Sequence, residues 1–192
     1  MKTYITIDGQ KVPMTNSLKE LGKMGKEVRR RARIALKARG KFVTGNLYKS
    51  IRYEQGVAKN EKSLDLKFMF PNAEYWKFVD EGVRGAVSSR KAPRSPFKFG
   101  SGKGPKGRLR PAIDRWTIRK GIAPRAAGGQ FTSRKGMVFA ISRSIYRTGI
   151  RPSYFFTNAY DKTLKQYDNK LEQAIAKDIG NALNQLSDGG TV

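Results

Sequence analysis

Hydrophobic and polar residues alternate with two different periods along the chain, and each period predicts one kind of secondary structure. Apolar side chains at every second position over residues 64–70 predict a half-buried strand. Residues 52–58 precede that strand and predict a second one. Residues 3–12 predict a short hairpin around Asp8-Gly9, a dipeptide that tight turns favour. Together these segments predict a small antiparallel sheet.

Apolar residues spaced three and four apart predict a long helix near the N-terminus. Ser17 followed by Glu20 is typical of a capping box, which opens a helix, and Gly40 stands where a helix would end. We therefore expect a helix of roughly 22 residues. Its expected buried face consists of Leu18, Leu21, Val28, Ala32, Ala35 and Leu36.

A second long helix is predicted toward the C-terminus. It begins between Ser153 and Asn158 and reaches Leu186. Its apolar stripe consists of Phe156, Tyr160, Leu164, Tyr167, Leu171, Ile175, Ile179, Ala182 and Leu186. Three shorter helices are predicted over residues 72–81, 111–120 and 137–147.

The order of these elements predicts an α+β fold: an N-terminal helix, a small antiparallel sheet and a long C-terminal helix, with a large basic insertion. Residues 1–82 and 150–192 form the expected core, and residues 83–149 form the Gly- and Pro-rich insertion with its short helices. No segment resembles a signal peptide or supplies the roughly 18 consecutive apolar residues of a membrane span. We expect a protein that is made and used in the cytoplasm and has no membrane partner.

Composition narrows the possible chemistry. The 192 residues include 40 Lys and Arg, 15 Asp and Glu, and no His or Cys, for a formal charge of +25. Without His and Cys the chain cannot build a zinc finger, a thiol nucleophile, a disulfide framework or an imidazole base. Catalysis would rest on carboxylates, lysines or hydroxyls, and we expect no cofactor and no bound metal.

The positive charge is concentrated in the middle of the chain. Residues 83–151 hold 18 basic side chains and one acidic one, Asp114. Single basic residues separated by Gly, Pro, Ser and aromatic residues suit contact with a phosphate lattice, and no motif for reading bases is present. Sequence-neutral contact with DNA is one interpretation, and contact with an acidic protein surface is the other. The expected contact residues are Arg84, Arg90, Lys91, Arg94, Lys98, Lys103, Lys106, Arg108 and Arg110.

Two further patterns suggest enzymatic chemistry. Residues 102–107 match G-x-G-x-x-G, but Pro105 lies inside the loop and Asp114 follows too soon for a dinucleotide site, which favours a flexible basic loop. Asp65 and Lys67 share one strand face and Glu54 lies upstream, which is the skeleton of a Mg²⁺-dependent nuclease.

A third candidate, the acidic pair Asp80 and Glu81, is less promising. Asp80 and Glu81 are adjacent, so their side chains point apart and make a poor acid/base pair. The favoured interpretation of these two residues is the C-terminal end of a helix.

Three short motifs carry a resemblance to a known family. The order is Val43–Ile51 (VTGNLYKSI) after a basic amphipathic helix, then Glu74–Gly82 (EYWKFVDEG) after two strands, then Ile150–Phe156 (IRPSYFF) before a closing helix. This order resembles the tail-completion and head–tail joining (neck) proteins of tailed bacteriophages. The chain departs from the family pattern at Val83, where threonine is usual, and in the length of the link between the last two motifs.

The resemblance implies a structural virion protein and not an enzyme. It implies a small α+β subunit that forms a ring, often a hexamer, around the DNA channel between the head connector and the tail tube. Portal or connector proteins and tail-tube proteins would be its partners, and viral DNA would pass through the ring. The alternative is a Mg²⁺-dependent nuclease or a stand-alone non-specific DNA-binding protein. The family-motif positions with structural roles are Gly45, Leu47, Ser50, Ile51, Val79, Glu81, Gly82, Arg151, Pro152 and Phe155.

Overall fold

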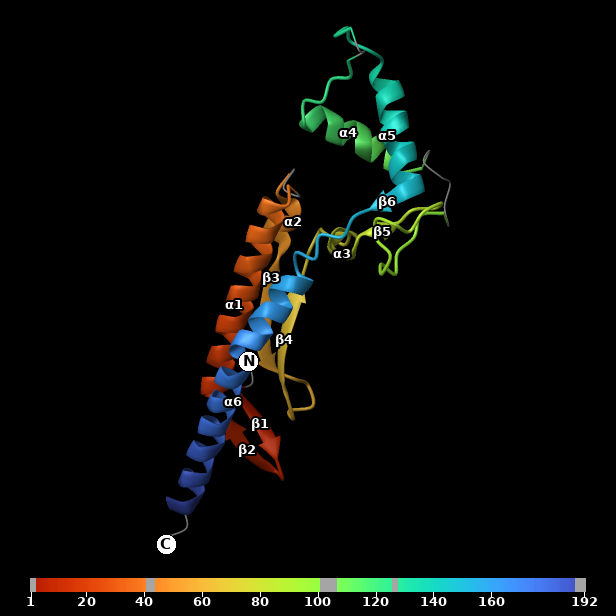
Figure 1. The fold of residues 1–192 in the computed structure, drawn as a ribbon. Coiled ribbons are helices and arrows are strands. Elements are labelled where there is room, and N and C mark those ends of the chain that lie inside the picture. The colour runs from red at the N-terminus through yellow and green to blue at the C-terminus, as the bar shows by residue number, and fades with distance from the viewer. Residues whose placement is uncertain (1–2, 41–43, 101–106, 126–127, 189–192) are drawn as a thin grey trace. The chain divides into compact units, whose positions relative to one another are not determined.

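The computed structural model describes residues 3–40, 44–100, 107–125 and 128–188. Over these residues the chain is α+β, as predicted, with six helices and three two-stranded antiparallel sheets (Figure 1). The chain divides into two compact units. The first unit comprises residues 1–37, 46–73 and 155–192, and the second comprises residues 38–45 and 74–154. The predicted insertion, residues 83–149, lies within the second unit, which extends beyond it on both sides.

Two long antiparallel helices form the frame of the first unit (Figure 1). Helix α1 spans Thr15–Ala38, and helix α6 spans Thr157–Asp188. Near one end of the pair Ser17 bonds to Asp178, and farther along Arg31 donates to Gln166 Oε1 at 2.6 Å. The higher-numbered residue of α1 therefore contacts the lower-numbered residue of α6, which shows that the helices run in opposite directions.

A β-hairpin covers this helix pair. Strand β3 spans Arg52–Val57 and β4 spans Leu64–Met69, which agrees with the two strands predicted from the sequence. On the face turned toward the helices, the Phe68 ring lies 5.1 Å from the Phe156 ring and 6.2 Å from the Tyr160 ring. The alternating pattern therefore buries its aromatic side against α6.

Helix α1 accommodates the hairpin through a glycine. A Cβ atom at Gly25 would lie 2.4 Å from the Tyr53 ring, so only glycine allows the strand to come this close to the helix backbone. The rest of the interior is aliphatic and aromatic. Its buried side chains include Met24, Val28, Ala32, Leu36, Leu47, Ile51, Phe70 and Phe155.

A small N-terminal hairpin completes the first unit. Strands β1 (Tyr4–Ile7) and β2 (Gln10–Pro13) pair around Asp8 and Gly9, whose φ angles of 47° and 82° confirm the predicted tight turn. The Thr6 backbone N–H donates to the Glu61 carbonyl oxygen at 2.7 Å, which ties this hairpin to the loop between β3 and β4. Helix α2 (Asn46–Ser50) lies directly before β3.

The N-terminus of α1 is capped by a residue from α6, and the predicted capping box at Ser17 and Glu20 is wrong. The helix begins at Thr15, so Ser17 lies inside its first turn. The Asp178 carboxylate instead accepts four hydrogen bonds of 2.7–3.1 Å, from the backbone N–H and the side chain of both Asn16 and Ser17. It satisfies amide donors that have no partner within the helix and complements the helix dipole.

These four donors also determine the acidity of Asp178. Burial of the carboxylate acts to raise its pKa, but the hydrogen bonds from Ser17 and Asn16 outweigh burial and hold the pKa below its ordinary value. The pKa of Glu27, on α1, is also lowered. Hydrogen bonds from Arg30 and Arg31 lower its pKa to about 2, against a smaller opposing effect of burial.

The buried face of α6 differs from the predicted stripe. Among the α6 side chains that the structure describes, the buried ones are Ala159, Thr163, Ala174 and Asp178, none of which belongs to the stripe. Leu164 and Ile175, which do belong to it, remain 37% and 38% exposed. Small side chains occupy the contact because the two helices and the hairpin pack closely, and the larger apolar residues lie beside this seam.

The second unit contains the shorter elements. Helix α3 spans Trp76–Glu81, α4 spans Leu109–Arg119 and α5 spans Arg134–Thr148, in agreement with the three short helices predicted from the sequence. Strands β5 (Val83–Arg84) and β6 (Gly149–Ile150) pair with each other. An ion pair of 3.1 Å between Arg134 Nε and Asp114 Oδ1 links α5 to α4.

We expect Asp178→Ala to destabilise the first unit by about 3 kcal/mol, because the substitution removes the cap and leaves buried donors unpaired. Urea unfolding followed by far-UV circular dichroism would measure this loss. Asp168→Ala, which removes an exposed carboxylate from the same helix, is the matched control and should change stability little. Equal stability of the two variants would contradict the capping role.

The same cap predicts a pH dependence. Because the folded state lowers the pKa of Asp178, its contribution is fully present above the ordinary carboxyl pKa and is lost as the pH falls through the folded value. The difference in unfolding free energy between the wild type and Asp178→Asn should therefore shrink as the pH is lowered below about 4. A difference that stays constant from pH 7 to pH 2 would contradict the prediction.

Candidate functional site

Two of the motifs that carry the family resemblance meet in the second unit. The end of α3 lies against the segment that follows β6, although they are some 70 residues apart in the chain. Ser153 donates from its hydroxyl to the Val79 carbonyl oxygen at 2.6 Å and from its backbone N–H to the Asp80 carbonyl oxygen at 2.9 Å. The Tyr154 backbone N–H donates to the same Asp80 oxygen at 2.8 Å. We call this contact the motif junction.

The motif junction holds the backbone in unusual conformations. Tyr154 has a φ of 45°, in the left-handed region that a bulky side chain seldom adopts. Asp80 is 1% exposed and lies beneath this contact. Conformations of this kind persist only where surrounding contacts impose them, so the hydrogen bonds to the Asp80 carbonyl fix the chain just before α6 begins.

Glycine allows strands β5 and β6, next to the junction, to pair at close range. The φ of Gly149 is 84°, and a Cβ atom there would lie 2.3 Å from the Val83 carbonyl oxygen. A Cβ atom at Gly85 would lie 2.1 Å from the Arg147 carbonyl oxygen. Both clashes are with backbone, which cannot move aside, so these positions require glycine for close approach. Gly82, with a φ of 73°, ends α3 as predicted.

The other motif positions have the environments of structural residues. Gly45 has a φ of 73°, which confirms that this turn requires a left-handed residue. Leu47 and Ile51 are buried, and the Ser50 hydroxyl donates to the Leu47 carbonyl oxygen at 2.8 Å. Phe155 is fully buried. Four positions reach the surface to different degrees: Val79, Glu81 and Pro152 are half-buried and Arg151 is exposed.

The predicted contact residues of the insertion that the structure describes have different local environments. Arg90 and Arg94 are exposed, while Lys91 donates to the Thr148 hydroxyl at 2.7 Å. Arg108 is exposed just before α4, and the Arg110 guanidinium lies over the Phe139 ring at 5.2 Å. Lys103 and Lys106 lie outside the described residues.

Arg84 and Lys98 lie beside each other as partners in a β-bridge. The Arg84 backbone N–H donates to the Phe97 carbonyl oxygen, and the Phe99 backbone N–H donates to the Arg84 carbonyl oxygen, on either side of Lys98. The Arg84 side chain is half-buried, and among the described residues its Nε atom has no hydrogen-bond partner. This buried guanidinium nitrogen remains available to an acceptor that the described chain does not supply.

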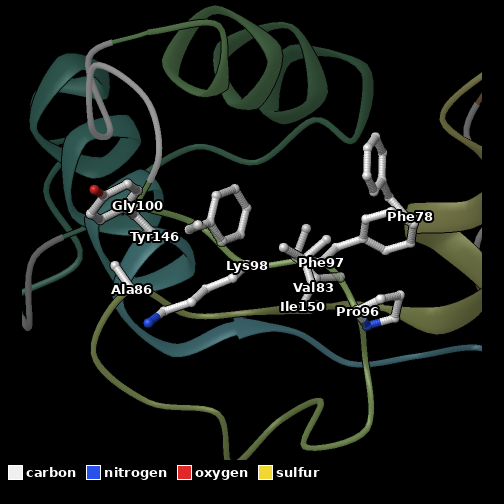
Figure 2. A pocket seen from close by; sticks show the side chains of 10 residues that line it. Phe78, Val83, Ala86, Pro96, Phe97, Lys98, Gly100, Tyr146 and Ile150 are labelled. Atoms are coloured by element: carbon white, nitrogen blue, oxygen red, sulfur yellow. The ribbon is translucent and has the colours of Figure 1, made fainter.

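The second unit also holds an aromatic groove, whose lining includes Phe78 and Ile150 from the two motifs of the junction (Figure 2). The groove has a volume of about 1050 Å³. The Phe78 ring lies 4.6 Å from the Phe97 ring in an edge-to-face arrangement, and the Phe99 ring lies 5.9 Å from the Tyr146 ring. The groove is lined by Phe78, Val83, Ala86, Pro96, Phe97, Lys98, Phe99, Gly100, Tyr146 and Ile150.

The aromatic groove is open to solvent and mainly apolar. Phe78 is 45% exposed although it is a large hydrophobic residue, and among the described residues of the lining Lys98 is the one that carries a charge. An exposed apolar surface of this kind is typical of a contact site for another molecule. The sequence offered one unused signal, the alternation Phe97-Lys98-Phe99, which places two aromatic residues on a short extended segment.

The nuclease-like residues lie on an open strand face. In the β3–β4 register Glu54 stands opposite Lys67, and Lys67 Nζ lies 3.5 Å from Asp65 Oδ2. The three side chains therefore share one face of the hairpin, as the spacing predicts, with Lys67 67% exposed. In the part of the chain that the structure describes, no three acidic, His or Cys residues lie close enough together to hold a metal ion. The G-x-G-x-x-G loop lies almost wholly outside that part.

Comparison with protein-family models, with curated proteins and with solved structures found no match to this chain. None of the described helices is both long enough and apolar enough to cross a membrane. What the second unit offers is a rigid backbone junction, an aromatic groove and a largely positive surface.

We expect Gly149→Ala to destabilise the second unit by about 3 kcal/mol, because it adds a backbone clash to an unfavourable left-handed conformation. Both tryptophans of the chain, Trp76 and Trp116, belong to this unit, so their fluorescence reports its unfolding. The matched control is Gly136→Ala in α5, where a Cβ atom meets nothing within 4 Å. That change should raise helix stability by about 0.5–1 kcal/mol, and equal effects of the two substitutions would refute the junction's role.

Proposed function

We propose that this protein is a structural subunit of a bacteriophage virion, a ring-forming tail-completion or neck protein that joins the head connector to the tail around the DNA channel. Its expected partners are copies of itself, with six to a ring as is common in the family that it resembles, together with portal or connector and tail-tube proteins. The basic second unit would contact these partners or the viral DNA without reading base sequence.

The motif junction is the observation that carries the proposal. Two of the short motifs that resemble the phage family, Glu74–Gly82 and Ile150–Phe156, are bonded to each other through Val79, Asp80 and Ser153. Short motifs that matched by chance would have no reason to meet in space after a separation of 67 residues. Their contact supports a shared structural role.

The surfaces of the chain are suited to assembly. The aromatic groove offers an apolar area of the kind that forms the centre of subunit interfaces. Its position beside the motif junction would hold a partner segment against a fixed backbone. We therefore expect the groove to be covered in the assembled ring.

A Mg²⁺-dependent nuclease is the second candidate, because Glu54, Asp65 and Lys67 share one face of the β3–β4 hairpin. Incubating the full chain with duplex DNA and Mg²⁺ tests it directly. Cleavage that Asp65→Ala abolishes would favour the nuclease, whereas intact DNA would end that candidate.

Assembly is the test of the proposed function. Light scattering and negative-stain electron microscopy of the full chain, alone and co-expressed with the products of neighbouring genes, should show ring-shaped oligomers. A chain that remains monomeric with those partners, and in the assembled particle, would overturn the proposal.

A point substitution links the groove to assembly. We expect Phe78→Ser to weaken ring formation at least tenfold in concentration, because it removes a large apolar contact at the open side of the groove. Phe131→Ser removes a more exposed aromatic residue, 70% exposed, from the same unit outside the groove lining and serves as the control. If both variants assemble like the wild type, the groove is not the subunit contact.

A further inference from the structure

The first unit carries a depression that differs chemically from the aromatic groove of the second unit. It lies between α1 and α6, which run side by side in Figure 1, and has a volume of about 420 Å³. Four lysines contribute to its lining: Lys19 and Lys23 from α1, and Lys170 and Lys177 from α6. The remaining lining residues are Asn16, Glu20, Gln173 and Ala174. We call it the lysine groove.

The positive charge of the lysine groove is only partly neutralised. Lys23 forms an ion pair with Glu20, the single carboxylate in the lining. Lys19, Lys170 and Lys177 are exposed, and Lys170 Nζ lies 5.1 Å from the Tyr167 ring centre. Three ammonium groups in excess of the carboxylate therefore surround a cavity whose polar lining can also donate hydrogen bonds.

The positive surface continues along α1 beyond the groove. Lys19, Lys23, Lys26 and Arg30 are spaced four, three and four residues apart, which places them on one face of the helix, and all four are exposed. At 1.5 Å per residue this face extends about 16 Å, long enough to follow several phosphates of a nucleic-acid strand. Arg30 is partly neutralised by Glu27, so the excess charge is greatest at the groove.

We propose that the lysine groove binds the phosphate backbone of nucleic acid. Lysine is depleted at the centre of protein–protein interfaces, whereas lysine side chains around a polar depression suit phosphate oxygens. Lysines are point charges without the planar fork that reads guanine, so the contact is independent of base sequence. This site goes beyond the proposed function, because it lies on the first unit and outside the basic insertion that the sequence singled out.

The geometry of the groove depends on the fold of the first unit. Its two walls are some 150 residues apart in the chain and meet because the Asp178 cap holds the α6 segment that carries Lys170 and Lys177 against the start of α1. Helices with the same composition but another register would leave four separate surface lysines. A phosphate group would gain from all of them only in this arrangement.

Salt-dependent DNA binding tests the proposal. The full-length variant Lys19→Gln/Lys170→Gln/Lys177→Gln would be titrated with a mixed-sequence 30-base-pair duplex at several salt concentrations. We expect the slope of log affinity against log salt to become shallower by about 2–3, since each phosphate contact contributes roughly 0.9. The control is Lys59→Gln/Lys162→Gln/Lys165→Gln, which removes the same charge from exposed positions of the same unit outside the groove lining.

A change in the opposite direction strengthens the test. Glu20→Gln removes the carboxylate of the groove and releases Lys23, so the duplex should bind severalfold more tightly. Equal slopes for the groove triple variant and its control would overturn the proposal, and this is also the result expected if the groove binds an acidic protein. Light scattering on the same variants keeps the two proposals apart, because ring assembly should survive the loss of the groove lysines.

Discussion

A carboxylate on α6, that of Asp178, accepts four hydrogen bonds from the first turn of α1, and this contact fixes how the two long helices lie against each other. Amide groups at the start of a helix need acceptors, and a buried carboxylate needs donors. The hydrogen bonds between them therefore offset the free-energy cost of removing both groups from water. Because the cap sets the register of α1 against α6, it also determines where the β3–β4 hairpin can pack and which lysines face each other.

The second unit depends on a backbone constraint instead of a side-chain charge. Strands β5 and β6 pair so closely that Gly149, and Gly85 just after β5, have no room for a Cβ atom. The segment after β6 is bonded to the end of α3. Gly82, the last residue of the Glu74–Gly82 motif, is under the same constraint, because a Cβ atom there would lie 2.5 Å from the Ile150 carbonyl oxygen. These glycines allow two segments of backbone that are far apart in the chain to meet.

The two units present surfaces of opposite character. The aromatic groove of the second unit is mainly apolar, with Lys98 as the one lysine among its described lining residues, whereas the lysine groove of the first unit is polar and cationic. A neck subunit of a phage, as proposed, must bind neighbouring proteins firmly while DNA passes without being held by base contacts. An apolar site for protein and a sequence-neutral site for phosphate would divide these tasks between separate surfaces.

The sequence by itself determined the elements whose signals are local. The turn at Asp8-Gly9, the alternation of β4 and the end of α3 at Gly82 each depend on neighbouring residues, and the structure agrees with all three. Only the tertiary structure decided the cap of α1, the buried face of α6, and both grooves. Asp178 lies some 160 residues from Ser17, and Phe78 and Tyr146 are also far apart in the chain, so no period or spacing could pair them. Such contacts form only when the elements pack together, because local patterns do not determine which face of a helix is buried or which distant residue it meets.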